Sequence, residues 1–169
     1  MFTLREIPTE QALLQLASRY PELDMPSVQA CLAFLRTTTE VYEALNAHFA
    51  RYDLSMGKFS VLMQLLQAGE QGLAPSECAE RIGVTRGTIT GLLDGLEREG
   101  WVRRQMHPED RRMLMVQLTE KGQQLMDGLL PDHFCRTTGL MANLTQAEKM
   151  MLVELLSKIR AGTPAMREP

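Results

Sequence analysis

The sequence predicts a mainly α-helical fold with one small β-hairpin, and three observations support this. Apolar residues recur at helical spacing through most of the 169 residues. A short helical pattern, a glycine and a second helical pattern follow one another at 74–99, which is the order of a helix-turn-helix. Directly after them, two runs of strand type flank a polar segment that contains a proline.

Two helices are expected before residue 55. A short one runs from Thr9 to Arg19 and ends before Pro21. Pro26 suits the first turn of a longer helix, because its missing N–H would have no intrahelical partner there. That helix continues to about Tyr52 and has a wide apolar face.

Three more helices are expected before residue 100. Ser55 caps the first of them, and the second covers 74–82. Gly83 then supplies a left-handed turn residue, and Thr85 caps the third helix by accepting from backbone N–H groups. The buried stripe of this third helix consists of Ile89, Leu92, Leu93 and Leu96.

The remaining sequence predicts the hairpin and two further helices. Strands are expected at 101–105 and 112–118. Thr119 caps a helix from Glu120 onward, which Pro131 should kink or interrupt. Thr145, with Glu148 three residues later, is a capping box that opens the last helix. The tail at 162–169 is expected to be disordered.

Composition and charge exclude several classes of protein. No apolar run approaches the roughly 20 residues that a membrane-spanning helix needs, and no secretory signal is evident. Three widely separated cysteines do not suggest a disulfide framework, so we expect a cytoplasmic protein without a membrane partner. The net charge is −3, yet residues 81–112 hold seven arginines against five acidic residues, which leaves −5 for the rest. Arginine suits phosphate and guanine because its planar fork donates two hydrogen bonds at once.

The third helix of the central group would expose a face rich in glycine. On a helical wheel, the side opposite the buried stripe carries Gly87, Thr90, Gly91, Asp94 and Arg98. Each glycine inside a helix costs about 1 kcal/mol relative to alanine, so two of them suggest a partner that approaches closely. In a DNA groove, the residues that would meet phosphates and base edges are Thr85, Arg86, Thr88 and Thr90. The alternative is an ordinary surface helix with capping threonines.

The hairpin tip adds a second basic projection. It carries Asp110, Arg111 and Arg112, and a narrow minor groove attracts an inserted arginine. Asp110 would hold one arginine in an extended rotamer. The alternative is a polar turn whose charges are only solvated.

The motifs between Ala74 and Gly122 resemble the MarR family of winged-helix transcriptional regulators. The matching segments are Pro75-Ser76-Glu77, Gly83-Val84-Thr85-Arg86-Gly87, Leu96-Glu97-Arg98-Glu99-Gly100-Trp101, Pro108-Glu109-Asp110-Arg111-Arg112 and Leu118-Thr119-Glu120-Lys121-Gly122. The resemblance implies a winged helix-turn-helix plus a helical dimerisation region. It also implies a recognition helix from Thr85 to Glu99 in the major groove, and Arg111, oriented by Asp110, in the minor groove. His107 departs from the family, which commonly has aspartate before this proline.

A homodimer is also expected from the apolar residues of the terminal regions. The long helix has a broad apolar face, and the terminal regions add further apolar residues. One protomer has too few other elements to cover all of this surface. The added residues are Leu13, Leu14, Leu16, Leu152, Leu155 and Ile159. We therefore expect dimerisation helices at 1–54 and 119–161, a DNA-binding lobe at 55–118 and a tail at 162–169. A twofold dimer reads a pseudo-palindrome whose half-sites lie about 10–10.5 bp apart, or a multiple of that.

Sensing sites are the least specific part of the sequence. The resemblance implies a pocket for a small aromatic or phenolic effector, and the residues on elements that would line it are Arg36, His48, Tyr52, Phe59 and Met63. Cys31 is the candidate for redox sensing, although a cysteine without a disulfide is more often a small buried hydrophobe. No metal site and no cofactor are expected, because the spacing of His133 and Cys135 is poor for ligands on a helix.

Together, these features predict a sequence-specific double-stranded DNA-binding transcriptional regulator. It would be a ligand-responsive repressor that acts as a homodimer on palindromic operators. Two alternatives stay open: a cysteine-based redox-sensing regulator of the same fold, and a winged helix used only for protein–protein contact. No motif of an enzyme is present, so catalysis is not expected.

Overall fold

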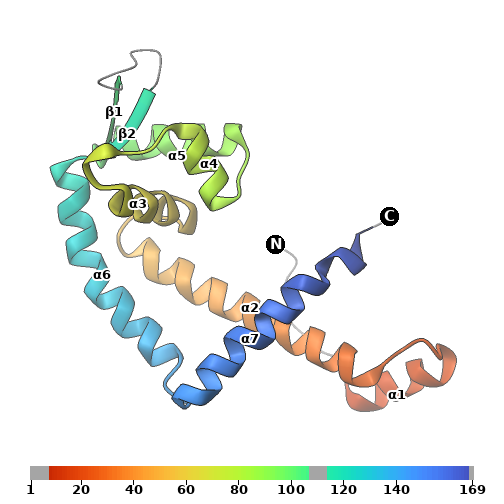
Figure 1. Cartoon of the computed structure of the whole chain (residues 1–169). Coiled ribbons are helices and arrows are strands. Elements are labelled where there is room, and N and C mark those ends of the chain that lie inside the picture. The colour runs from red at the N-terminus through yellow and green to blue at the C-terminus, as the bar shows by residue number, and fades with distance from the viewer. Residues whose placement is uncertain (1–7, 107–113, 168–169) are drawn as a thin grey trace. The chain divides into compact units, whose positions relative to one another are not determined.

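The computed structural model describes residues 8–106 and 114–167, which form two compact units (Figure 1). The first unit extends to Thr119 and the second begins at Glu120. The first holds five α-helices and a two-stranded sheet, and the second holds two α-helices. This agrees with the expected mainly helical fold with a small hairpin.

The first two helices begin close to their predicted starts, and each has a side-chain cap that the sequence analysis did not name. In front of α1 (Glu10–Arg19), the hydroxyl of Thr9 accepts from the Ala12 N–H at 3.2 Å. In front of α2 (Met25–Ala50), the carboxylate of Asp24 accepts from the Ser27 N–H at 2.9 Å, and Pro26 lies in the first turn. Each cap satisfies a backbone donor that has no partner inside its helix.

Three helices pack around the core of the first unit: α3 (Met56–Ala68), α4 (Pro75–Ile82) and α5 (Arg86–Arg98). Ser55 and Thr85 cap α3 and α5 as predicted. A 3₁₀ turn, η1 (Gly69–Gln71), ends α3, and Gly83 takes the left-handed conformation between α4 and α5. The side chains that fill the core and are at most 1% exposed include Val61, Leu62, Leu65, Cys78, Ile89, Leu93, Leu96 and Val116.

The hairpin consists of β1 (Val102–Met106) and β2 (Leu114–Leu118), which pair antiparallel from Val102 opposite Leu118 to Met106 opposite Leu114. A third segment borders β2, because Leu73 exchanges two backbone hydrogen bonds with Val116, at 3.0 and 2.8 Å. The centre of β2 therefore has a hydrogen-bonded neighbour at each of its two edges. Met115, Val116 and Gln117 are all buried, in place of the alternating exposure of a half-buried strand.

Trp101 lies at the joint between α5 and the hairpin. The residue is 8% exposed, and the ammonium group of Lys58 lies 5.7 Å from the centroid of its ring. Its backbone N–H donates to the Leu96 carbonyl at 3.0 Å, and its carbonyl accepts from the Thr119 N–H at 3.1 Å. The joint is thus held by hydrogen bonds on both sides of the tryptophan.

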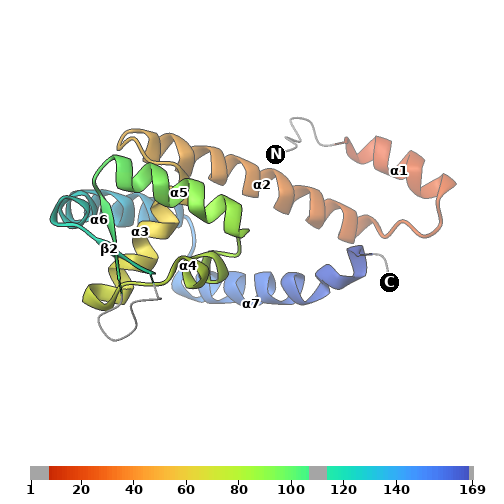
Figure 2. The same cartoon turned by 90° about the horizontal axis from the view of Figure 1, so that it is seen from above.

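The second unit differs from expectation in two places. Helix α6 (Glu120–Leu140) continues through Pro131, so the proline does not interrupt it (Figure 1). Proline has no N–H, so position 131 makes no bond to the carbonyl four residues earlier. Helix α7 (Gln146–Gly162), seen from the side in Figure 2, begins with the predicted capping box of Thr145 and Glu148. Beyond it, the expected disordered tail contains a 3₁₀ turn, η2 (Thr163–Met166), in which the Thr163 hydroxyl donates to the Arg160 carbonyl.

Within residues 8–106 and 114–167, every helix is too short or too polar to cross a lipid bilayer.

Gly72 and Gly69 give a matched test of the packing beneath the hairpin. Both have positive φ, +66° and +61°, so alanine at either position brings backbone strain of about 1–3 kcal/mol. Only at Gly72 would the new methyl group also collide with the Val116 carbonyl oxygen and lie 2.6 Å from Gln117 Cγ, whereas Gly69 faces open space.

We therefore expect Gly72→Ala to lower the free energy of unfolding by about 2 kcal/mol more than Gly69→Ala, in the range typical of steric overpacking. Urea unfolding followed by circular dichroism measures both values. Equal losses in the two variants would contradict the close approach of Gly72 to β2.

Candidate nucleic-acid interface

Helix α5 turns its predicted polar face to solvent. Ile89, Leu93 and Leu96 are at most 1% exposed, which fixes the rotation of the helix about its axis. The opposite side is therefore open. The predicted DNA-contacting residues of this helix that are exposed are Thr85, Arg86, Gly87, Thr88, Thr90 and Arg98.

The threonines of α5 form hydrogen bonds within the helix. Thr85 Oγ1 accepts from the Thr88 N–H at 3.2 Å and lies 2.9 Å from Thr88 Oγ1. The Thr90 hydroxyl donates to the Arg86 carbonyl at 2.9 Å. Their hydroxyl protons are thus largely engaged, which leaves methyl groups and oxygen lone pairs for an external partner. A threonine methyl group is suited to contact with the methyl group of thymine.

The side chain of Arg86 differs from these threonines in its hydrogen bonding. Across the part of the chain that the structure describes, its guanidinium makes no hydrogen bond or ion pair. A hollow of about 450 Å³ lies beside it, lined by Ala74, Pro75, Ser76, Arg86, Ile89, Thr90 and Leu114. The first turns of α4 and α5 and the start of β2 therefore meet around a concave surface that holds an arginine available for a ligand.

The two glycines on the exposed face have no steric reason within the described residues. A Cβ atom at Gly91 would have nothing within 4 Å, and one at Gly87 would have only Thr85 Oγ1, at 3.9 Å. By contrast, a Cβ atom at Gly57 in α3 would lie 3.2 Å from Leu92 Cδ2, so the leucine side chain would have to shift. The packing of the described residues therefore leaves room for a side chain at positions 87 and 91.

The predicted tip residues Asp110, Arg111 and Arg112 lie outside the described residues, so their part in this surface stays a prediction. The strands that carry the tip are well anchored. Arg103 Nη2 donates to Gln117 Oε1 at 3.1 Å, and the Gln117 side-chain amide donates to the Glu70 carbonyl. These contacts connect both strands to η1.

The structure brings together part of the predicted effector site. The rings of His48 and Tyr52 lie 5.7 Å apart, and Phe59 stacks on Phe49, the neighbour of His48, at 4.2 Å. His48 and Phe59 are buried, and Met63 is half-buried.

Arg36 does not join this group of rings. It precedes His48 by twelve residues on the same helix, which separates their Cα atoms by about 18 Å. It pairs instead with Glu40, at 2.9 Å. The role of these five residues in binding an effector stays a prediction.

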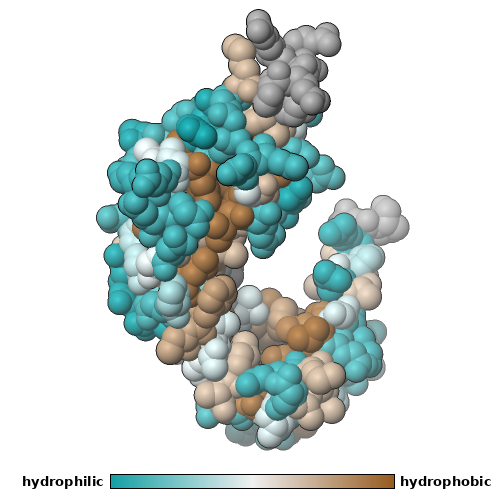
Figure 3. All heavy atoms as spheres, turned by 60° about the vertical axis from the view of Figure 1, so that its left-hand side comes forward, coloured by the Kyte–Doolittle hydropathy of each residue, from teal (hydrophilic) through white to brown (hydrophobic). Residues whose placement is uncertain are grey.

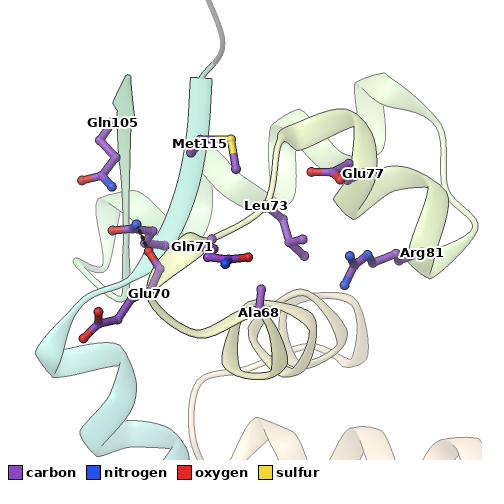
Figure 4. A pocket seen from close by; sticks show the side chains of 10 residues that line it. Ala68, Glu70, Gln71, Leu73, Glu77, Arg81, Gln105 and Met115 are labelled. Carbon is purple, nitrogen blue, oxygen red and sulfur yellow. Dashed lines mark hydrogen bonds between the residues drawn. The ribbon is translucent and has the colours of Figure 1, made fainter. Parts of the chain in front are cut away.

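A cavity of about 620 Å³ that the sequence patterns did not indicate lies between η1, α4 and the hairpin (Figure 4). Glu77 and Arg81 project toward it from α4, and Met115 and Gln117 line it from β2. The signal in the sequence was Gly72, which lines the cavity and lies close to β2, but a lone glycine does not reveal which strand it approaches.

The three cysteines differ in environment. Cys78 is fully buried, and burial, with the nearby charge of Glu77 as a second cause, raises the pKa of its thiol to about 11. Such a thiol carries almost no thiolate at neutral pH. Cys31, the predicted redox candidate, and Cys135 are exposed. Among the described residues, no cluster of three or more His, Cys, Asp or Glu side chains is placed to hold a metal ion.

Known proteins are similar to this chain in sequence and in fold. The model of the MarR family matches residues 54–114. The HTH-type transcriptional repressor YetL of Bacillus subtilis is 36% identical over 156 residues, which cover 92% of this chain and 93% of that repressor. A crystal structure of a MarR mutant from E. coli, complexed with operator DNA, is 26% identical and has a TM-score of 0.67, with 81% of this chain and 99% of that chain covered. The S. aureus MepR–DNA complex, at 20% identity and a TM-score of 0.69, covers 78% of this chain and 94% of its own and shares the fold.

Gly91→Ala tests whether the glycine serves something other than the fold. Because the site is open and helical, alanine should raise the free energy of unfolding by about 1 kcal/mol. The same change at Gly128, an open helical position in α6, is the matched control and should give a similar gain. Thermal unfolding of the two variants measures both effects. A loss of stability in Gly91→Ala would show that the glycine is needed within the chain.

Proposed function

Because the chain belongs to the MarR family, we propose that it is a sequence-specific DNA-binding transcriptional regulator that acts as a homodimer on palindromic operators. The observation that carries this proposal is the exposed face of α5. Among the described residues, the Arg86 guanidinium makes no hydrogen bond or ion pair there, and the two glycines leave room for a Cβ atom. The similarity to a protein named a transcriptional repressor favours repression over activation. Such a regulator works where the chromosome lies, so we place it in the cytoplasm.

Two elements would engage the duplex. The start of α5 enters the major groove, with Arg86 directed at a guanine and the threonine methyl groups at thymines. Gly87 and Gly91 allow the helix to approach the groove walls. Arg111 at the hairpin tip enters the adjacent minor groove, with Asp110 as its orienting partner and Arg112 beside it. The crystal structure of a 26%-identical MarR with operator DNA supports this class of ligand.

The homodimer is supported by apolar side chains that the single chain leaves uncovered. On α7, Met150, Val153, Leu155 and Ile159 are between 48% and 68% exposed. Leu14 and Leu16 on α1 and Leu35 and Tyr42 on α2 are also exposed, at 40% or more. Hydrophobic side chains, coloured brown, are visible on the face of the molecule that Figure 3 shows. Large exposed apolar patches mark sites of association, and a second copy with the same faces would cover them.

Regulation would work through the spacing of the two recognition helices. A small aromatic or phenolic acid bound near His48, Tyr52 and Phe59 would favour a dimer whose α5 helices no longer match the half-sites. Such a ligand shifts the equilibrium only by the difference between its affinities for the two states.

One experiment tests the proposed function as a whole. The purified protein is used to select duplexes from a randomised pool, and light scattering measures its mass in solution. We expect selected sequences with twofold symmetry and a mass of twice the 19.1 kDa chain. Affinity should fall steeply with salt, because phosphate contacts release counterions. Selection of no sequence, with binding that ignores salt, would favour a protein–protein module.

Arg86→Ala tests direct reading of a base. If the guanidinium binds guanine through two hydrogen bonds, its loss should cost about 1–3 kcal/mol of binding free energy and relax the preference at one base pair per half-site. Fluorescence anisotropy against the selected duplex and its single-base variants measures both effects. An unchanged base preference would remove Arg86 from the recognition surface.

Arg111→Ala tests the minor-groove contact of the hairpin. Because this arginine would meet the backbone environment and not a particular base, its removal should weaken binding to many sequences alike. The slope of log K against log salt should fall by about 1. Titrations at several salt concentrations give the slope, and a slope equal to that of the unmodified protein would contradict the contact.

A further inference from the structure

Arg104 joins the hairpin to helix α5 through two acidic side chains. Its Nη2 lies 2.6 Å from Asp94 Oδ1, and its Nη1 lies 2.8 Å from Glu97 Oε2. The Arg104 side chain is 25% exposed, more buried than either of its partners. One guanidinium thus bridges two carboxylates one turn apart on α5, with a separate nitrogen of its planar fork for each.

The backbone of Arg104 takes part in the same contact. In the sheet, Arg104 lies opposite Val116, whose own N–H and carbonyl bond to Leu73 on the far side. The Arg104 N–H therefore points away from β2, toward α5, where Glu97 Oε1 accepts it at 3.2 Å. An edge strand normally leaves such a donor to water, whereas here α5 satisfies it. The first strand of the hairpin is in this way fixed to α5.

Asp94 is placed where an unbalanced negative charge would matter most. It follows Thr90 and Gly91 by four and three residues, so it lies on the same exposed side of α5. Its side chain is 57% exposed. In the proposed complex this side faces the duplex, and a bare carboxylate there would repel phosphates. Arg104 supplies the charge that balances it.

We propose that Arg104 is a positioning residue for DNA binding, which acts through Asp94 and Glu97. It holds β1 against the recognition helix and neutralises the carboxylate of Asp94 at the DNA-facing side. This inference rests on the proposed function. It adds that the acidic residues of α5 are tolerated in a DNA-binding surface only because the hairpin provides their counter-charge.

Four variants separate this role from a direct DNA contact or a purely structural one. They are Arg104→Met, Asp94→Asn, the Asp94→Asn/Arg104→Met double variant, and Arg136→Met as the control. Arg136 forms a comparable ion pair with Asp132, at 2.9 Å, on α6. The dissociation constant is measured with the duplex selected by the unmodified protein, at low and at physiological salt. Circular dichroism and the melting temperature report on folding.

We expect Arg104→Met to weaken binding about tenfold at low salt, the scale of one unfavourable charge at the rim of a charged interface. Asp94→Asn should bind at least as tightly as the unmodified protein, and the double variant should regain most of the loss. The loss in Arg104→Met should shrink as salt rises, because the Debye length falls from about 30 Å at 0.01 M to about 8 Å at 0.15 M. Arg136→Met should leave binding unchanged.

Three results would overturn the proposal. Unchanged binding in Arg104→Met removes any role for the residue. An equal loss in the double variant assigns the effect to a direct contact of Arg104 with DNA. A tenfold loss in Asp94→Asn alone shows that Asp94 itself binds the duplex, and this outcome decides the matter even if Arg104→Met does not fold. If the unmodified protein selects no duplex, the proposed function fails first, which keeps the two failures distinguishable.

Discussion

The burial of Ile89, Leu93 and Leu96 is the constraint on which the rest of the first unit depends. These side chains face α3 and α4 across a core with almost no exposed area, so α5 can take only one rotation about its axis. Close packing of this kind does not permit small rotations without opening a void. The side of the helix that carries arginine, threonine and glycine is therefore held outward by the buried side chains of the opposite side.

The hairpin is held in place by a second set of contacts, mostly polar. Leu73 pairs with Val116, Gln117 reaches η1, and Arg104 reaches α5. Each contact ties one strand to a different neighbour, so the sheet of two strands does not depend on its own pairing alone. A lone hairpin is marginally stable in water, and this explains why so many of its side chains are committed to anchoring.

The helices and their starts could be predicted from local sequence signals, whereas contacts between residues far apart in the sequence could not. Ser55, Thr85 and Thr145 were identified as caps because a cap needs only the next three residues. The alternation of β2 did not predict that Met115, Val116 and Gln117 are all buried, nor that Leu73, 43 positions earlier, pairs with Val116. The ion pairs of Arg104 could not be predicted from the sequence either, because its partners are seven and ten residues away on a different element. The exposed face of α5 was predictable, while the tip at 107–113 remains an expectation.

The position of the single tryptophan has a practical consequence. Trp101 lies between α5 and β1. The ammonium group of Lys58 lies near its ring, and its backbone N–H and carbonyl both form hydrogen bonds. The fluorescence of an indole responds to nearby charge and to polarity. Because the sequence has one tryptophan, the indole fluorescence comes from this position alone. The protein thus contains its own optical reporter at the joint between the two elements that would enter the grooves, and their relative movement is open to observation without any label.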